Sequence, residues 1–191
     1  MMRSSVRTRQ AAPEIMYKII ENFLPEEYQN AMEESVLNGE TQWTFNRFTA
    51  YKSSAYNVSD ELKKNISSFR HVVYQNGSVV DPKLYDLFRI IPDKLGAKRI
   101  HNMICQLQLV TSGTHTPIKH VDLPNFVVPY YSAVYYINKS DGPTVLYNQD
   151  GTEMVRCEHE RGKVIMFDGN IQHHASRPTT DIRCIMNFCF E

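Results

Sequence analysis

The chain has 191 residues, of which 42% are hydrophobic and 22% charged, and its formal net charge is zero. This composition is that of an ordinary globular protein, long enough to bury a core within one domain, and it argues against wholesale disorder. A net charge of zero supplies no long-range field that would concentrate DNA, RNA or an anionic membrane, so nucleic acid is not an expected partner.

The cysteines and the apolar runs indicate the compartment. Four cysteines show no CxxC spacing, and three of them fall in apolar, strand-like stretches, which favours buried free thiols over disulfides: Cys105, Cys157, Cys184 and Cys189. No apolar run approaches the roughly 20 residues that span a bilayer, and MMRSSVRTRQ lacks the apolar region of a secretory leader. We therefore expect a soluble, cytoplasmic protein with no membrane partner.

The first half of the chain predicts supporting elements around two helices. Residues 1–12 read as a flexible basic tail, and residues 14–23 and 41–51 are strand candidates. Residues 24–40 predict a helix, because a proline and acidic residues come early and a glycine follows the end; Tyr28, Met32 and Val36 would share its inner side.

A second helix is predicted between Asp81 and Gly96, with Pro82 at its start. Its apolar positions are Leu84, Leu87, Phe88 and Ile91, and Pro92 would kink or shorten it.

From about residue 100 the chain becomes a series of short β-type runs separated by turn-forming groups such as TSGT, NKSDG, NQDG and FDGN. The predicted strands are HNMICQLQLV, YYSAVYYIN, PTVLYN, GKVIMF and RCIMNFCF. Helices followed by short strands predict an α+β or mainly β fold, an antiparallel sandwich or jelly roll. Within one domain over residues 13–191, residues 13–99 would support a β core formed by residues 100–191.

The stretch KHVDLPN contains the first candidate for a metal site. His120 and Asp122 are two residues apart in an extended segment, so their side chains point the same way and can converge on one ion. Two histidines and one carboxylate on one face of an octahedron leave three positions open, which is the arrangement of non-haem Fe(II) oxygenases. A surface turn pair is the alternative interpretation of these two residues.

The third ligand would come from DGNIQHHASRPTTDIRCIMNF, in which His173 and His174 are adjacent. Arg183 opens the last β run and could supply a two-pronged donor to a carboxylate. The alternatives are that these are ordinary loop histidines, and that Arg183 forms a salt bridge with Asp181 or Asp168.

At these residues the sequence resembles the prolyl-hydroxylase-like branch of the Fe(II)/2-oxoglutarate oxygenases. HVDLPN and SAVYYIN resemble the corresponding region of the hypoxia-type prolyl hydroxylases, and HASRPTTDIR is similar to the branch's His-x-x-x-Pro segment that ends in the cosubstrate-binding arginine. YKIIENFLPEEYQNAMEESV resembles the strand and helix that open this superfamily, and the stretch from FRHVVYQNG to LQLV resembles small oxygenases encoded by tailed phages.

The resemblance implies a double-stranded β-helix and assigns roles to individual residues. His120, Asp122 and His174 would bind Fe(II), with His173 as the alternate third ligand. The distal carboxylate of 2-oxoglutarate would bind Arg183 and the Tyr136 hydroxyl, with Ser132 close to the cosubstrate. The sequence departs from the family at Val110, where the hypoxia-type enzymes have a tyrosine that contacts 2-oxoglutarate.

The implied activity is hydroxylation of a C–H bond with consumption of 2-oxoglutarate and dioxygen and release of succinate and CO2. A carboxylate at Asp122 favours hydroxylation, because related halogenases have a small residue there. By analogy the substrate would be a prolyl residue of a protein, in the host cytoplasm if a phage encodes the chain. A free amino acid, a nucleobase and a non-catalytic metal- or ligand-binding jelly roll are the alternatives. Residues 49–60 and 123–131 would form substrate-recognition loops.

Overall fold

The computed structural model describes residues 16–46, 68–112 and 118–191. Its helices are α1 (Glu26–Leu37), α3 (Pro82–Phe88) and α4 (Ile90–Leu95). Its strands are β1 (Tyr17–Ile20), β2 (Thr44–Asn46), β3 (Ser68–Gln75), β4 (Ser78–Val79), β5 (Ile100–Gln108), β6 (Tyr131–Tyr136), β7 (Thr144–Tyr147), β8 (Glu153–Cys157), β9 (Val164–Asp168), β10 (His173–Ala175) and β11 (Arg183–Phe190).

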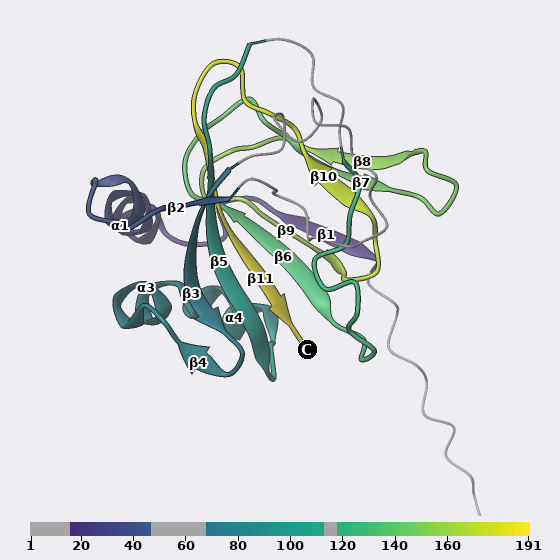
Figure 1. Cartoon of the computed structure of the whole chain (residues 1–191), viewed down its shortest axis with the longest axis horizontal. Coiled ribbons are helices and arrows are strands. Elements are labelled where there is room, and N and C mark those ends of the chain that lie inside the picture. Colours follow the sequence, from purple (N-terminus) through teal and green to yellow (C-terminus); the bar gives the residue numbers. More distant parts are fainter. Residues whose placement is uncertain (1–15, 47–67, 113–117) are drawn as a thin grey trace, which may run out of the picture.

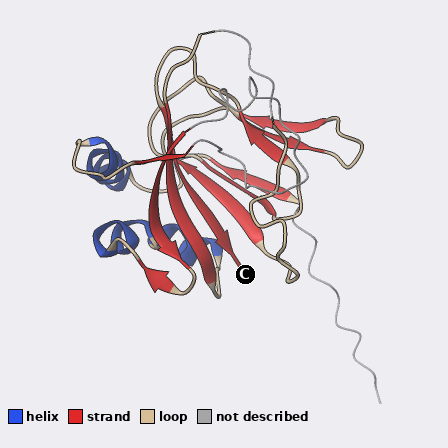
Figure 2. Ribbon diagram, viewed as in Figure 1, coloured by secondary structure: helices blue, strands red, loops and turns tan. Residues whose placement is uncertain are grey.

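The strands form a jelly roll made of a large and a small antiparallel sheet. The large sheet has the order β1-β9-β6-β11-β5-β3-β2, with β4 paired to β3, and the small sheet has the order β10-β7-β8. The helices lie to one side of the large sheet and the small sheet lies to the other (Figures 1 and 2). The predicted jelly roll with supporting helices is confirmed.

The two faces of the large sheet pack against different cores, as β11 illustrates. All eight of its residues are buried, and because side chains alternate along a strand, they divide between two environments. Cys184, Met186, Phe188 and Phe190 belong to the core beneath the helices. Ile185 belongs to the second core, which includes Leu146 and Cys157 of the small sheet's strands. The odd-numbered residues of β11 therefore face the jelly-roll interior.

Helix α1 packs on the sheet through Gln29, Met32 and Val36. The sequence placed Tyr28 on this face, but Tyr28 is 42% exposed. The buried face is turned by one position, because Gln29 Nε2 donates to the Leu24 carbonyl at 2.7 Å and is satisfied beneath the helix.

The predicted second helix is divided into α3 and α4. Asp81 caps α3, since its side chain accepts a hydrogen bond from the Leu84 amide at 3.0 Å, and Pro82 begins the helix. Pro92 lies in the first turn of α4, where a missing N–H breaks no helical hydrogen bond, and Gly96 ends α4 with a φ of 85°. Leu84, Phe88 and Ile91 are buried as predicted.

Asp81 should contribute measurably to stability, because its second oxygen also lies 2.9 Å from His71 Nε2. We expect Asp81→Ala to lower the free energy of unfolding in urea by about 1–2 kcal/mol, as loss of an N-cap does. Asp81→Asn should cost less, because asparagine also caps helices. Asp86→Ala, at an exposed position of the same helix, is the matched control. Equal effects of the two alanine variants would contradict this role.

Several elements were not predicted from the sequence, namely β3, β4, β8 and the short β10.

All four cysteines are buried and free, as predicted. Within the described ranges, no helix is both long and apolar enough to cross a membrane. The predicted tail at 1–12 and the predicted loop at 49–60 lie outside the described residues. The single domain over 13–191 stays a prediction.

Candidate metal centre

Backbone pairing brings His120 and His173 together, although they are 53 residues apart in the sequence and no local pattern connects them. The two residues form an isolated antiparallel bridge, in which each amide donates to the other's carbonyl at 2.9 Å. Residues directly opposite each other in an antiparallel pair project from the same side, and the two imidazole rings lie 4.5 Å apart between centroids.

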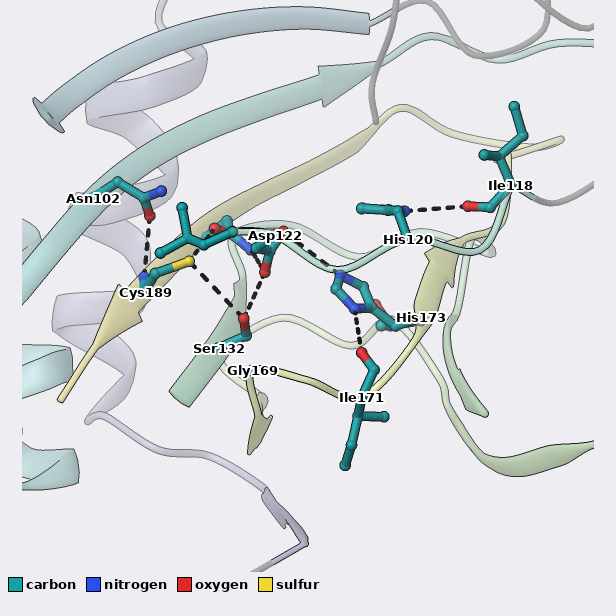
Figure 3. A network of polar contacts seen from close by, with 12 residues as sticks. Asn102, Ile118, His120, Asp122, Ser132, Gly169, Ile171, His173 and Cys189 are labelled. Atoms are coloured by element: carbon teal, nitrogen blue, oxygen red, sulfur yellow. Dashed lines mark hydrogen bonds and ion pairs between the residues drawn. The ribbon is translucent and has the colours of Figure 1, made fainter. Parts of the chain in front are cut away.

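Asp122 completes the cluster. Its Oδ1 lies 3.6 Å from His173 Nε2, and the candidate ligand atoms of His120, Asp122 and His173 all lie within 4.8 Å of one another. Figure 3 shows the three side chains converging from the 118–122 segment and the start of β10. The group is the two-histidine, one-carboxylate set that suits Fe(II) with open coordination positions.

Hydrogen bonds to backbone carbonyls orient the two histidine side chains. His120 Nδ1 lies 3.1 Å from the Ile118 carbonyl, and His173 Nδ1 lies 3.1 Å from the Ile171 carbonyl. A carbonyl can only accept, so each Nδ1 carries the proton and each Nε2 presents its lone pair when the ring is neutral. Both histidines are therefore held in the tautomer that a metal ligand requires.

The Asp122 carboxylate is held from the opposite side. Its Oδ2 accepts hydrogen bonds from Ser132 Oγ at 2.7 Å and from Asn187 Nδ2 at 3.1 Å. Ser132 lies on β6 and Asn187 on β11, so the large sheet itself sets the orientation of the carboxylate. Oδ1 is left facing the histidines, as a single-oxygen ligand would be.

Burial and charge set the protonation of the cluster. Burial alone would raise the pKa of Asp122, but His173, His120 and the Ser132 hydroxyl outweigh it and hold that pKa well below its usual value. Burial, reinforced by His173, lowers the pKa of His120 to about 4. Burial also acts to lower the pKa of His173, but Asp122 overcomes it and raises that pKa. A divalent cation would compete with a proton for His173 Nε2, because a metal ligand must be neutral.

The structure does not bring His174, the preferred third ligand from sequence, to this cluster. Its Nδ1 lies 2.9 Å from the Tyr147 hydroxyl and its Nε2 lies 3.2 Å from Ser176 Oγ. Successive residues of a strand point to opposite faces, so only one of two adjacent histidines can face His120. His173, the alternate candidate, is the histidine that the structure brings to His120 and Asp122.

Arg183 lies at a second buried position of the interior. It is 1% exposed, its Nε donates to the Gly142 carbonyl at 2.8 Å, and its Nη2 donates to Thr144 Oγ1 at 3.0 Å. Gly142 permits this approach, because a Cβ there would lie 2.9 Å from Arg183 Cδ. The predicted alternative, a salt bridge to Asp181 or Asp168, is not among its contacts with the described residues.

The third guanidinium nitrogen, Arg183 Nη1, is buried and has no hydrogen-bond partner among the described residues. A buried cation without a counter-charge is costly, so an anion that reached this nitrogen would be stabilised. Burial lowers the pKa of Arg183 from its usual value, yet arginine remains protonated in proteins.

Tyr136 lies on the same interior face, because it is paired with Ile185, two residues after Arg183. Its hydroxyl donates to the Cys157 carbonyl at 3.3 Å, and its ring stacks on His159 at 4.4 Å between centroids. His159 is buried, and burial with Arg183 nearby lowers its pKa to about 2. A neutral imidazole thus supports the tyrosine.

The other residues singled out in the sequence lie in different parts of the structure. Ser132, expected near the cosubstrate, donates a hydrogen bond to the Asp122 carboxylate. Val110 is 46% exposed. The sequence did not single out Asn187 or Thr144. An asparagine within the apolar run RCIMNFCF could have indicated Asn187, whereas no pattern pointed to Thr144.

Ser132 offers a test of this outer support. We expect Ser132→Ala to weaken Fe(II) binding by about 10–100-fold, the usual effect of losing an outer-shell partner. Competition with a chelating dye under nitrogen would measure it. Ser176→Ala removes a hydroxyl that contacts His174 instead and should leave Fe(II) affinity unchanged; a loss there as large as in Ser132→Ala would contradict the assignment.

Comparison with known proteins places this geometry in context. No family model matches the sequence, and no curated protein matches it either. A prolyl hydroxylase from Trichoplax adhaerens, in complex with a hypoxia inducible factor peptide, superposes with a TM-score of 0.63 at 15% identity, over 92% of this chain and 83% of that one. A 2OG-Fe(II) oxygenase family oxidoreductase from Burkholderia pseudomallei gives a TM-score of 0.64 at 13% identity, over 93% and 86%.

HygX from Streptomyces hygroscopicus, solved with nickel, 2-oxoglutarate and hygromycin B, gives a TM-score of 0.57 at 11% identity, over 92% of this chain and 82% of that one. At these identities the likeness establishes the fold. The chain has the double-stranded β-helix fold of the 2-oxoglutarate and Fe(II) oxygenases.

Proposed function

We propose that this chain is an Fe(II)- and 2-oxoglutarate-dependent dioxygenase that hydroxylates a C–H bond. His120, Asp122 and His173 would hold the iron, and Arg183 with the Tyr136 hydroxyl would hold the distal carboxylate of 2-oxoglutarate. When bound with dioxygen, these groups supply oxidation of an unactivated C–H bond, with release of succinate and CO2.

The residues of the chain have distinct tasks in this proposal. Ser132 and Asn187 fix the carboxylate so that one oxygen faces the iron, and two backbone carbonyls fix the imidazole tautomers. The buried Arg183 supplies charge-assisted hydrogen bonds that orient the cosubstrate. The enclosing sheets bury His173 and Arg183 away from solvent.

One observation carries the proposal: the oriented His120, Asp122 and His173 cluster shares the jelly-roll interior with a buried guanidinium that lacks a counter-charge among the described residues. A non-catalytic metal-binding module would require only the first of these features. The test is to add Fe(II) and then 2-oxoglutarate to the protein under nitrogen, record the visible metal-to-ligand band, admit oxygen and measure succinate.

Wild type should give both signals, and Asp122→Ala should give neither. Metal binding without a band and without succinate would identify the non-catalytic alternative.

The substrate class has support in two directions. The Trichoplax prolyl hydroxylase bound to a peptide supports a prolyl residue, as the sequence resemblance implied. HygX with hygromycin B bound supports a polar small molecule.

A further inference from the structure

A cavity of about 430 Å³ opens beside the candidate metal centre, and His120 and Asp122 form part of its lining. Gln106 of β5 lines the same cavity. Within the described part of the chain, no hydrogen bond or ion pair engages the Gln106 side chain. Its amide has two N–H donors and one acceptor oxygen, and a molecule bound in the cavity could use them.

The register of the large sheet fixes the direction of the Gln106 side chain. Gln106 pairs with Ile185 of β11, and residues directly opposite each other in an antiparallel pair project from the same side. Ile185 belongs to the core on the interior face. In contrast, Cys105 belongs to the core beneath the helices, and Leu107 packs against that core. Gln106 therefore faces the jelly-roll interior, as the metal centre and Arg183 do.

Gln106 also lies between the two groups that would hold 2-oxoglutarate. On β11, Ile185 is midway between Arg183 and Asn187, and Asn187 donates to the Asp122 carboxylate. Strand geometry puts the Cα atoms of Arg183 and Asn187 about 13 Å apart. Strand β5 runs directly beside β11 in the sheet, at about 5 Å (Figure 1). A keto acid that reached from Arg183 to the metal would therefore pass beside Gln106.

The metal end of 2-oxoglutarate carries a second carboxylate, C1, beside the keto group. A carboxylate oxygen turned away from the metal needs a hydrogen-bond donor, because a buried charge without a partner is costly. The amide of Asn187 is already used, since its Nδ2 donates to Asp122. Asn102 pairs with Cys189, which is beyond Asn187 and farther from Arg183. Gln106 is the amide placed between the two ends of the cosubstrate.

We propose that Gln106 is a cosubstrate-binding residue whose Nε2 donates a hydrogen bond to the C1 carboxylate of 2-oxoglutarate. This inference rests on the proposed function and adds a residue to its cosubstrate site. Arg183 would bind the distal carboxylate, and Gln106 would orient the end beside the metal. A neutral amide suits this position, because a lysine or arginine there would repel the divalent cation.

Two keto acids separate the Gln106 contact from the Arg183 contact. 2-Oxopentanoate keeps the C1 carboxylate and the keto group of 2-oxoglutarate but lacks its distal carboxylate. Each keto acid is titrated into the Fe(II) protein under nitrogen, and the visible metal-to-ligand band gives its Kd. We expect Gln106→Leu to raise the Kd of both keto acids about tenfold or more, as loss of a hydrogen bond to a charged group does. Arg183→Gln should raise the Kd of 2-oxoglutarate alone.

A second variant and a control make the test specific. Gln106→Glu keeps the shape of the side chain but places a negative charge beside the C1 carboxylate, so it should weaken 2-oxoglutarate binding more than Gln106→Leu does. Gln75→Leu is the matched control, because Gln75 lines the same cavity but pairs with Asn102, at the other end of β5. It should leave both Kd values unchanged. Far-UV circular dichroism and Fe(II) affinity, unchanged in both leucine variants, would exclude misfolding and loss of metal.

An unchanged Kd of 2-oxoglutarate in Gln106→Leu would overturn the inference and leave the proposed function standing. A loss seen with 2-oxoglutarate but not with 2-oxopentanoate would also overturn it, because Gln106 would then act at the distal carboxylate. Absence of the band when 2-oxoglutarate is added to the Fe(II) wild type would instead refute the proposed function itself. The two failures are therefore distinguishable.

Discussion

Replacing His173 should abolish Fe(II) binding, whereas replacing its neighbour His174 should not. His173 lies opposite His120 with its Nε2 directed at Asp122, while both nitrogens of His174 contact hydroxyl groups outside the cluster. We expect His173→Ala to reduce Fe(II) affinity by more than the ~100-fold that replacing a residue behind a ligand can cause, because the side chain expected to bind the metal directly is lost. Succinate formation should fall to background.

His174→Ala should keep Fe(II) affinity while lowering stability by about 1–3 kcal/mol, since it removes the two hydrogen bonds of a buried ring. Titration of Fe(II) under nitrogen, with far-UV circular dichroism as a control for folding, separates the two effects. His173→Gln, which conserves more of the side-chain volume, guards against loss through misfolding. Retention of metal by His173→Gln together with its loss in His174→Ala would show that the third ligand is His174.

Replacing Arg183 should remove 2-oxoglutarate binding while leaving Fe(II) bound. A hydrogen bond to a charged group contributes about 1.5–3 kcal/mol, so losing it should raise the KM for 2-oxoglutarate by about 10–100-fold or more in Arg183→Gln. Arg183→Lys keeps the charge but loses the planar pair of donors, and it should restore only part of the affinity. Tyr136→Phe removes one hydroxyl and should cost about tenfold or less.

Thermal unfolding provides an independent measurement of the Arg183 effect. A ligand that binds only the folded state raises Tm, so 2-oxoglutarate should raise the Tm of the metal-loaded wild type and not that of Arg183→Gln. Arg161→Gln is the matched control, because Arg161 pairs with Glu26 and Glu33 at the surface. An unchanged KM and an unchanged Tm increase in Arg183→Gln would show that the anion site is elsewhere.

Local patterns were enough to predict most of the supporting elements. The caps at Asp81 and Gly96 follow from residue chemistry, and their positions agree with the structure. The core strands were recognisable because they are short apolar runs bounded by turn residues. In contrast β3, SFRHVVYQ, mixes polar and apolar residues on a partly covered strand, so it lacks a clear period of two.

By itself the sequence predicted the jelly roll, the proximity of the His120 and Asp122 side chains, and a histidine and an arginine from the last thirty residues as candidate site residues. Tertiary structure decided which of His173 and His174 faces His120, because a shift of one residue in strand register sends a side chain to the opposite face. It also decided that Asn187 supports Asp122. These contacts arise between strands far apart in sequence, whose register is set by non-local pairing that no local pattern encodes.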